Sequence, residues 1–259
     1  MGVINVTPDS FSDGGLYHST DRAIEYAKLL IEEGADILDI GGESTRPGSD
    51  FVSVEEELSR VMPVIKALVR MNFPASIDTS KPQVMQQAID AGVTMVNDVN
   101  ALREPGALEA VANNETLICL MHMQGQPSNM QKNPQYIDVV DDVMNFLQQY
   151  MDVALAAGIA KDRLVVDPGF GFGKNLTHNL QLLNRIRDFK KLGVPILAGL
   201  SRKSMLGTIT GNEVGQRVHE SVAAALLATI NGANILRVHD VKATKDAIAV
   251  YNAMIDTVQ

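Results

Sequence analysis

Gly34-Ala-Asp-Ile-Leu-Asp39 is the first of three stretches that share one design, the others being Gly92-Val-Thr-Met-Val-Asn97 and Gly232-Ala-Asn-Ile-Leu-Arg237. Each follows a run with helical periodicity, and each ends in a polar residue at the same offset from the glycine. A glycine suits the left-handed position that ends a helix, and a short apolar run without alternation is typical of a parallel strand buried on both faces. These stretches therefore predict three joints between a helix and a strand.

The rest of the chain repeats this alternation. Strands are predicted near 2–6, 35–40, 74–78, 94–98, 116–121, 163–167, 195–200 and 234–238, with helical patterns between them. Eight alternations in 259 residues favour an α/β fold of the closed (β/α)8 TIM barrel type over an open doubly wound sheet, and we expect a single domain over residues 1–259. The nucleotide-binding alternative requires G-x-G-x-x-G after the first strand, where this chain has Asn5-Val-Thr-Pro.

Two helix starts are marked in the sequence. Ser53-Val-Glu-Glu56 is typical of a capping box, in which the serine and the glutamate each bind a main-chain N–H of the first turn. Pro82, which follows Lys81, suits the first turn of the next helix because that turn needs no N–H at this position.

Composition limits the class of protein. Hydrophobic residues make up 46% of the chain, the only cysteine lies in the apolar run Leu117-Ile-Cys-Leu120, and no disulfide framework exists. No run approaches the roughly 20 apolar residues that a membrane span needs, and no basic and apolar leader opens the chain, so we expect a cytoplasmic protein without a membrane partner. The net charge of −9 and the absence of a lysine and arginine cluster argue against a nucleic-acid partner.

Polar residues stand at the carboxyl end of every predicted strand, where the loops of such a barrel build the active site. They are Asn5, Asp39, Asp78, Asn97 with Asp98, His122, Asp167, Ser201 with Arg202 and Lys203, and Arg237 with His239. Any one of them could cap a helix or form a turn. All eight strand ends meeting at one rim predict a polar binding site.

The chemistry of this rim indicates an anionic ligand with a flat heterocycle. Arg46, Arg202, Lys203, Arg237 and His239 bring local positive charge, while Asp78, Asn97 and Asp167 suit the amide-like edges of a ring system. The carboxylates could instead be the acid and base of a glycosidase, but that interpretation leaves the basic residues without a role.

Two motif alternatives are weaker. The stretch Asp167-Pro-Gly-Phe-Gly-Phe-Gly-Lys-Asn175 has proline and asparagine where a Walker loop needs glycine and serine or threonine, and its glycines indicate close approach of backbone and ring to a planar ligand. The five histidines show no zinc spacing. A Mg²⁺ ion shared between one protein oxygen and a substrate phosphate would leave almost no signature and remains open.

Eight motifs together resemble the dihydropteroate synthase family from Met1 to about residue 255. They are NVTPDSFSDGG at 5–15, DIGGESTRPG at 39–48, IDTSKP at 77–82, VND at 96–98, CLMHMQG at 119–125, DPGFGFGKN at 167–175, GLSRKSMLG at 199–207 and RVHDV at 237–241. The resemblance implies condensation of 6-hydroxymethyl-7,8-dihydropterin diphosphate with p-aminobenzoate to give dihydropteroate and pyrophosphate in folate synthesis. It also implies Mg²⁺ as cofactor, sulfonamides as competitors of p-aminobenzoate, and a homodimer.

The resemblance assigns residues to three parts of the site. Those implied to hold the pterin are Asp78, Asn97, Met121, Asp167 and Lys203. Those implied for the diphosphate and Mg²⁺ are Asn5, Arg237 and His239, with Asn5 as the metal ligand. Those implied around p-aminobenzoate are Phe11, Thr45, Arg46, Pro47, Phe172 and Ser204, and Gly199 belongs to the substrate site through the motif that it shares with Lys203.

The implied mechanism breaks a carbon–oxygen bond with cationic character at the pterin methylene. Its catalytic residues would be Asp78, Asp167, Lys203 and Arg237, with Asp13 and Arg46 paired across two closing loops, 7–15 and 43–50. A corrinoid-linked, pterin-dependent methyltransferase and a catalytically silent pterin-binding homologue are the alternatives. Family members usually carry a further segment before the first strand, and Met1 falls within that strand, so we expect either a longer chain or a short first strand.

Overall fold

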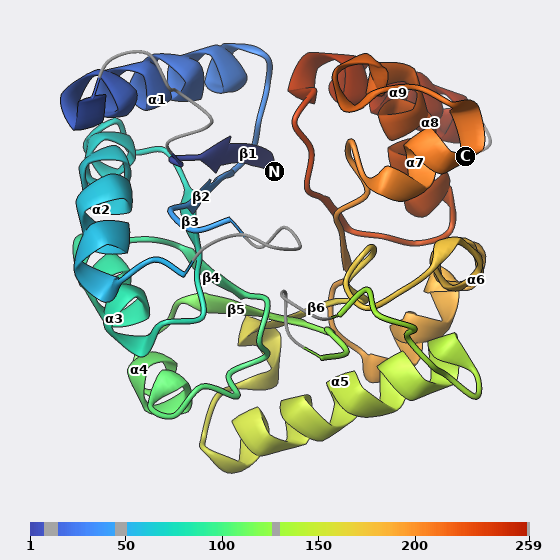
Figure 1. Cartoon of the computed structure of the whole chain (residues 1–259), viewed down its shortest axis with the longest axis horizontal. Helices are drawn as coiled ribbons and strands as arrows, with labels where there is room; N and C mark the ends of the chain where they lie inside the picture. Colours follow the sequence, from blue (N-terminus) through green and yellow to red (C-terminus); the bar gives the residue numbers. More distant parts are fainter. Residues whose placement is uncertain (8–14, 45–50, 126–129, 258–259) are drawn as a thin grey trace.

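The structure is a computed structural model that describes residues 1–7, 15–44, 51–125 and 130–257. Eight parallel strands lie at its centre, and helices cover their outer side (Figure 1). The strands are β1 (Gly2–Asn5), β2 (Leu38–Gly41), β3 (Ala75–Asp78), β4 (Met95–Asp98), β5 (Leu117–Met121), β6 (Leu164–Asp167), β7 (Leu197–Ala198) and β8 (Ile235–Leu236).

The strands close into the expected (β/α)8 barrel. β1 to β6 form one sheet in chain order, and β7 pairs with β8. Single parallel bridges join the two sheets, one between Val166 and Ile196 and one between Gly2 and Val238. At the second bridge Val238 N donates to Met1 O at 2.9 Å and Val3 N donates to Val238 O at 3.1 Å, so the last strand returns to the first.

The helices follow the strands around the outside of the ring, as the colour order in Figure 1 shows. They are α1 (Gly15–Glu32), α2 (Val54–Arg70), α3 (Pro82–Ala91), α4 (Ala107–Ala112), α5 (Val139–Ala156), α6 (Leu176–Asn184), α7 (Ser204–Thr210), α8 (Val218–Ile230) and α9 (Val241–Asp256), with short 3-10 helices η2 (Lys161–Arg163), η3 (Ile186–Leu192) and η4 (Val214–Gln216). Within the described residues no helix is long and apolar enough to cross a membrane.

The three predicted helix-to-strand joints are confirmed. Gly34, Gly92 and Gly232 have φ of 91°, 102° and 111°, the left-handed conformation that favours glycine. The residue after each glycine still bonds back to the helix, as Ala35 N does to Leu30 O at 2.9 Å. Because the helix end uses these first residues, β2 begins at Leu38 and not at residue 35 as predicted.

The strands β7 and β8 are shorter than the predicted ranges 195–200 and 234–238. The side chain of Asn234 explains their late start, because its Oδ1 accepts from Ile196 N at 3.0 Å. Asn234 N and Ile235 N both donate to Ile196 O. A side-chain acceptor thus replaces a main-chain partner at the foot of this strand pair.

One of the two predicted helix starts is confirmed in full. Pro82 occupies the first turn of α3, after Lys81 as the N-cap. At α2 the Ser53 hydroxyl accepts from Glu56 N at 3.2 Å, but the Glu56 carboxylate pairs with Arg60 one turn later. The capping box is therefore half formed, because an ion pair along the helix competes for the glutamate.

Side chains alternate between two cores along each strand, as the period of two requires. The larger core lies between strands and helices and contains Ile4, Ile40 and Ile77. The smaller one fills the inside of the barrel with Met1, Met95, Cys119, Val165 and Leu197, so the cysteine is a buried thiol as expected. The strand residues two positions beyond the inner layer consequently face the barrel interior as well.

Candidate active site

A polar layer lies on the inner face of the strands, just beyond the apolar inner layer. Asn97 follows Met95 by two residues, Asp167 follows Val165, and Met121 follows Cys119. Asp39 and Asp78 also face inward, because their neighbours Ile40 and Ile77 belong to the outer core. The strand period thus gathers these side chains at the carboxyl end of the barrel.

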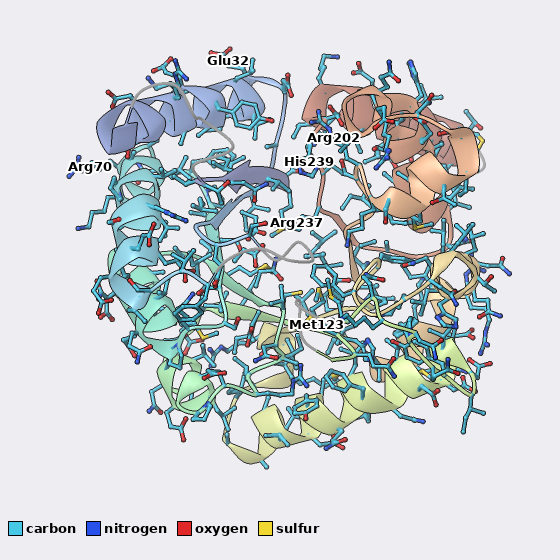
Figure 2. The ribbon with its side chains drawn as sticks, viewed as in Figure 1. Glu32, Arg70, Met123, Arg202, Arg237 and His239 are labelled. Carbon is cyan, nitrogen blue, oxygen red and sulfur yellow. The ribbon has the colours of Figure 1, made fainter. Side chains whose placement is uncertain are left out.

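Arg237 joins this layer into a cluster that we call the mouth cluster, made of Asp39, Asp78, Asn97 and Arg237. The Arg237 guanidinium donates through Nε to Asp39 Oδ2 and through Nη2 to Asp78 Oδ2, both at 2.6 Å. Asn97 Nδ2 donates to the same Asp39 Oδ2 at 3.0 Å. Figure 2 shows Arg237 inside the ring of strands, which places a cation at the centre of the mouth.

Burial governs the electrostatics of the mouth cluster. Burial raises the pKa of Asp78 to about 7, against the lowering effect of Arg237 and with further raising by Asp39 and Glu57. Burial opposes the charge on Arg237, but Asp39 and Asp78 outweigh it and raise the pKa of this guanidinium above its usual range. The cluster therefore holds one permanent cation and one carboxyl group that gains or loses a proton near neutral pH.

Two acceptor atoms of the mouth cluster have no protein partner within the described residues. They are Asp39 Oδ1 and Asn97 Oδ1, and both are buried. A buried polar atom left unpaired costs about 1–3 kcal/mol, and such atoms are uncommon. A ligand that brings N–H donors to the mouth would satisfy them.

Asp167 and Lys203 form the opposite wall of charges. Asp167 Oδ1 accepts from Gly169 N at 2.7 Å, and burial raises the pKa of this carboxyl although Lys203 lowers it. Lys203 donates to Phe170 O, and its Nζ lies 4.5 Å from the centroid of the Phe172 ring. Burial lowers the pKa of Lys203 to about 8.

An apolar wall borders the same region. Met121 is buried with Val99, Met123 and Met130, and the half-buried Phe172 packs against them. Thioether and aromatic side chains adapt to a flat ring. The site thus combines an apolar wall with acceptors and cations at its edges.

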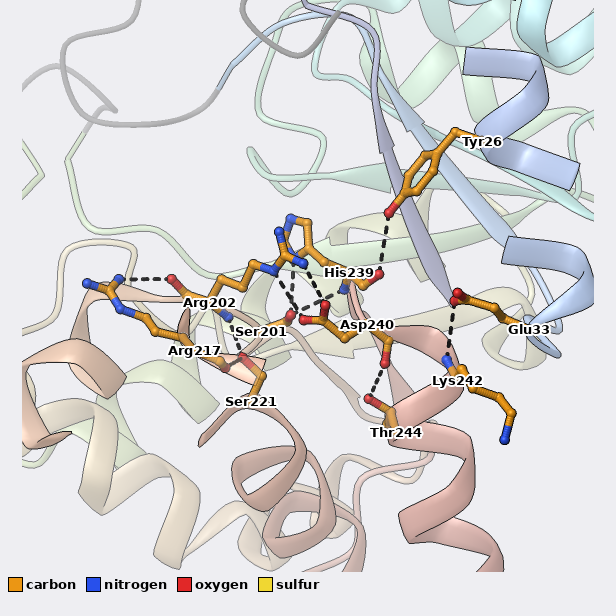
Figure 3. Close-up of polar contacts among 10 residues, drawn as sticks. All are labelled: Tyr26, Glu33, Ser201, Arg202, Arg217, Ser221, His239, Asp240, Lys242 and Thr244. Atoms are coloured by element: carbon orange, nitrogen blue, oxygen red, sulfur yellow. Dashed lines mark hydrogen bonds and ion pairs between the residues drawn. The ribbon is translucent and has the colours of Figure 1, made fainter. Parts of the chain in front are cut away.

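The loops after β7 and β8 are tied together by side chains (Figure 3). Ser201 Oγ accepts from His239 N at 3.2 Å and lies 3.0 Å from His239 Nδ1.

Arg202 pairs with Asp240 through Nε at 3.1 Å and Nη2 at 2.5 Å. Arg202 has φ of 59°, and its N–H donates to Ser221 Oγ at 2.9 Å. Its guanidinium therefore binds a neighbouring loop, whereas Lys203 turns toward Phe170 and Phe172.

The glycine-rich loop 168–175 corrects one expectation. Phe170 is fully buried in the outer core, so its ring does not approach a ligand. The glycines serve contacts within the protein, because a Cβ at Gly169 would lie 1.9 Å from His122 O and one at Gly173 would lie 2.6 Å from Gln124 O. Only Phe172 of the two aromatic rings borders the site.

Lys174 and its partners hold this loop, and we call His122, Lys174 and Asn179 the loop anchor. Lys174 Nζ lies 2.9 Å from His122 Nδ1, Gly169 O and Phe172 O. Asn179 accepts from Gly171 N at 2.7 Å and donates to Lys174 O at 3.3 Å. Burial and then Lys174 lower the pKa of His122 to about 2, so its imidazole is neutral and Nδ1 accepts a hydrogen bond from Lys174 Nζ.

The structure brings most of the expected site residues to one end of the barrel. Asp78, Asn97, Met121, Asp167, Phe172, Gly199, Lys203 and Arg237 border the barrel interior or its mouth, and Asn5, Ser204 and His239 stand at the ends of β1, at the start of α7 and after β8. Phe11, Asp13, Thr45, Arg46 and Pro47 lie outside the described residues.

Sequence reasoning left two buried polar residues of this region without a role, Asp39 and Lys174. Asp39 carries the same signal as Asn97 and Arg237, because it stands at the same offset from a helix-ending glycine. Lys174 had no such signal, since a lysine in a glycine-rich loop can equally face solvent. Tertiary contacts alone show that it is buried.

The described residues can be tested for a place that would hold the implied Mg²⁺ ion. Within the described ranges no group of three or more histidine, cysteine, aspartate or glutamate side chains could hold a metal ion. A Cβ at Gly41 would lie 3.6 Å from Asn5 Oδ1 and 3.8 Å from Asp78 Oδ2, so the glycine leaves space between these two oxygens. The donor set fits an ion that a ligand also coordinates, because the protein alone supplies few oxygens.

Comparison with known proteins agrees with this geometry. The sequence profile of the family described as "Pterin binding enzyme" matches residues 1–239. The dihydropteroate synthase of Haemophilus influenzae is 52% identical over 255 residues, covering 98% of this chain and 92% of its own length.

Two solved structures show the same fold. The dihydropteroate synthase of Yersinia pestis, in complex with a sulfonamide drug, has a TM-score of 0.94 and 50% identity and covers 99% of this chain and 94% of its own. The Xanthomonas albilineans enzyme with 4-aminobenzoic acid has a TM-score of 0.93 and 55% identity and covers 98% and 92%. The chain belongs to the dihydropteroate synthase family of pterin binding enzymes.

Proposed function

We propose that the mouth cluster and the wall formed by Asp167 and Lys203 perform the family reaction in this chain. That reaction condenses 6-hydroxymethyl-7,8-dihydropterin diphosphate with p-aminobenzoate and releases pyrophosphate. The observation that carries the proposal is the buried, unpartnered acceptor Asn97 Oδ1, which Asp39 links to the Arg237 guanidinium. This acceptor requires an N–H donor. The Nη1 group of Arg237, which makes no hydrogen bond within the described residues, offers donors to an anion of the same ligand.

A dihydropterin diphosphate meets both requirements. Its amino-pyrimidinone edge carries N–H donors for Asp78, Asn97 and Asp167, and its carbonyl oxygen is an acceptor for the Lys203 ammonium. Its flat ring suits the apolar wall that includes Met121. We assign these five residues to the pterin.

The diphosphate is assigned to Arg237, His239 and Asn5. The Nη1 group of Arg237 makes no hydrogen bond within the described part of the chain, so its donors remain for phosphate oxygens. Asn5 would hold a Mg²⁺ ion together with the diphosphate, in the space beside Gly41. When bound, such an ion supplies positive charge that offsets the charge of the departing pyrophosphate.

The p-aminobenzoate site is assigned to the side of Phe172, Ser204 and Gly199. Ser204 is the first residue of α7, and its exposed hydroxyl can donate to a carboxylate. The Xanthomonas albilineans structure contains 4-aminobenzoic acid and the Yersinia pestis structure a sulfonamide drug. We therefore propose that both kinds of compound compete for this site here.

In the chemical step the protein stabilises the two charges that form as the carbon–oxygen bond breaks. The bond between the pterin methylene and the bridging oxygen breaks with its electron pair on the oxygen, and the arylamine nitrogen then bonds to the carbon and loses a proton. Arg237 stabilises the negative charge on the leaving oxygen, and the carboxylates of Asp78 and Asp167 stabilise the positive charge on the pterin. Each of these groups is already in place before the substrate binds, so little reorganisation is needed.

A homodimer is a further part of the proposal. Exposed apolar side chains gather on two neighbouring helices, Leu227 and Ile230 on α8 and Val250 and Met254 on α9. A second copy of the chain would cover them. Light scattering of the purified protein gives the mass that tests this.

The decisive experiment measures pyrophosphate release with both substrates, with each one alone, and without Mg²⁺. We expect release to require both substrates and the product mass to be that of dihydropteroate. Pyrophosphate release that ignores p-aminobenzoate would contradict the proposal. Methyl transfer from a methylated pterin, without any pyrophosphate, would identify the methyltransferase alternative.

A further inference from the structure

Asp39 touches two residues that the proposed function assigns to different parts of the substrate. Its Oδ2 accepts from Asn97 Nδ2 at 3.0 Å and from Arg237 Nε at 2.6 Å. Asn97 belongs to the pterin part and Arg237 to the diphosphate part. The Asp39 side chain is fully buried, so solvent cannot replace either contact.

The contact with Asn97 sets the direction of its amide group. Because Nδ2 donates to Asp39, the carbonyl Oδ1 must point the other way, and it has no partner within the described residues. A free amide could present either its donor or its acceptor to a ligand. Asp39 removes this choice and presents the acceptor.

The contact with Arg237 sets the plane of the guanidinium. Asp39 binds Nε and Asp78 binds Nη2, and the two bonds come from adjacent strands, β2 and β3. A planar group held at two of its nitrogens by two separate carboxylates cannot rotate about its long axis. Its Nη1 group then faces away from both acids.

We infer that Asp39 is a positioning residue for the reaction, one that fixes the Asn97 amide and the Arg237 guanidinium together and so sets the acceptor and the anion site in one geometry. The inference rests on the proposed function. It adds a residue that acts through Asn97 and Arg237, and it predicts that one substitution weakens binding of both parts of the substrate. A residue with a purely structural role would lower stability without changing the affinity of the folded protein.

Ser76 offers a matched control. It stands opposite Asp39 in the register of β2 and β3, it is fully buried, and its hydroxyl lacks a partner within the described part of the chain. Within the described residues no hydrogen bond joins its side chain to Asn97 or Arg237. The variant Ser76→Ala therefore reports what a change in the same layer does to stability alone.

The test measures three quantities in Asp39→Ala, Asp39→Asn and Ser76→Ala. They are the dissociation constant of 6-hydroxymethyl-7,8-dihydropterin without its diphosphate, that of pyrophosphate with Mg²⁺, and the KM for p-aminobenzoate at saturating pterin diphosphate. In Asp39→Ala we expect both dissociation constants to rise about tenfold or more, because both partners lose their orientation. The KM for p-aminobenzoate should change less than about twofold, since its site lies elsewhere.

The conservative variant separates the two contacts. Asp39→Asn keeps an acceptor oxygen for Asn97 Nδ2 but holds Arg237 Nε through a weaker, uncharged hydrogen bond. Pterin affinity should therefore recover most of its value, while pyrophosphate affinity stays reduced because the guanidinium is less firmly oriented. Unchanged affinity for both probes in either variant overturns the inference. If Asp39→Ala does not fold, the dissociation constant of pyrophosphate in Asp39→Asn is the deciding measurement. An unchanged value then overturns the inference.

Failure of the proposed function would look different. In that case the wild-type protein would release no pyrophosphate from the two substrates. The binding experiment needs no turnover, so the role of Asp39 can fail while the function holds. Melting temperatures of the three variants confirm that the binding data come from folded protein.

Discussion

The mouth cluster and the loop anchor are both buried and polar, yet they differ in how fully their hydrogen bonds are satisfied. In the loop anchor Lys174 Nζ lies 2.9 Å from each of three acceptors, and Asn179 uses both its oxygen and its amide. In the mouth cluster Asp39 Oδ1 and Asn97 Oδ1 have no partner within the described residues. The complete network holds a loop in place, and the incomplete one awaits a ligand.

Arg237 in the mouth cluster should show the strongest effect on activity. Arg237→Met removes the cation that faces the leaving group, so we expect kcat/KM to fall about 1000-fold or more. Pyrophosphate release at fixed Mg²⁺ measures it. Arg237→Lys, which keeps the charge but not the fork of donors, should recover only part of the loss. If kcat/KM falls less than about tenfold in Arg237→Met, the mouth cluster has a structural role and not a catalytic one.

The two lysines that touch the loop 168–175 should separate activity from stability. Lys203→Met is expected to lower kcat/KM about 100-fold and leave the free energy of unfolding at pH 7 unchanged or higher, because burial already disfavours its charge and lowers its pKa to about 8. Steady-state kinetics and urea unfolding on the same sample measure both quantities.

Lys174→Met is the matched variant in the loop anchor. It leaves Gly169 O, Phe172 O and His122 without their buried donor. The loss of these three bonds outweighs the relief of the burial that lowers the pKa of Lys174, so we expect the free energy of unfolding to fall by about 2–4 kcal/mol. The folded fraction should keep its activity within about tenfold. Loss of turnover in Lys174→Met at full stability, or unfolding of Lys203→Met, would contradict the assignment of Lys203 to activity and of Lys174 to stability.

The mouth cluster should also show itself in the pH dependence of kcat/KM. Asp78 must be ionised to support a cationic pterin, and its raised pKa of about 7 makes activity fall as the pH drops below 7. Lys203 must be protonated to donate, and its lowered pKa of about 8 makes activity fall as the pH rises above 8. We expect a bell-shaped profile, in which kcat/KM falls about tenfold one pH unit below the acidic limb and one pH unit above the alkaline limb.

Lys203→Arg serves as the control for the alkaline limb. Its guanidinium stays protonated, so whatever activity remains should not decline between pH 8 and 10. An alkaline limb that persists in this variant would assign it to another group.

The smallest effect is expected at Gly199. Among the described residues a Cβ there would meet the Arg237 side chain alone, at 3.8 Å from its Cβ and 4.0 Å from its Cδ, which is ordinary contact. Gly199→Ala should change the free energy of unfolding by less than about 0.5 kcal/mol and kcat/KM by a few-fold at most. A larger loss of activity would show that the mouth needs this glycine for the substrate itself.

Most of the fold could be read from the chain because its signals are local. Gly34, Gly92 and Gly232 end helices through their own conformational freedom, and the apolar runs after them become strands wherever the sheet forms. The ends of the strands were harder to place. The late start of β7 depends on a bond between Ile196 and Asn234, which lie far apart in the chain, and no local pattern shows such a bond.

The site was predictable to the extent that strand ends converge in a barrel. Asp78, Asn97, Asp167 and Arg237 were expected there and lie there. Phe170 was misplaced, because a ring among glycines can turn toward a ligand or toward the core, and only packing decides which.

The alternation of strands and helices, and the kinds of side chain that meet at the mouth, follow from the amino-acid sequence alone, because periodicity and strand ends are local properties. The tertiary structure decided which polar atoms pair with one another. Asp39 became the partner of Asn97 and Arg237, and Lys174 became buried, because these contacts join residues that lie far apart in the chain. A hydrogen bond requires a donor–acceptor distance that is right to within a few tenths of an ångström, and only the closed barrel sets these distances.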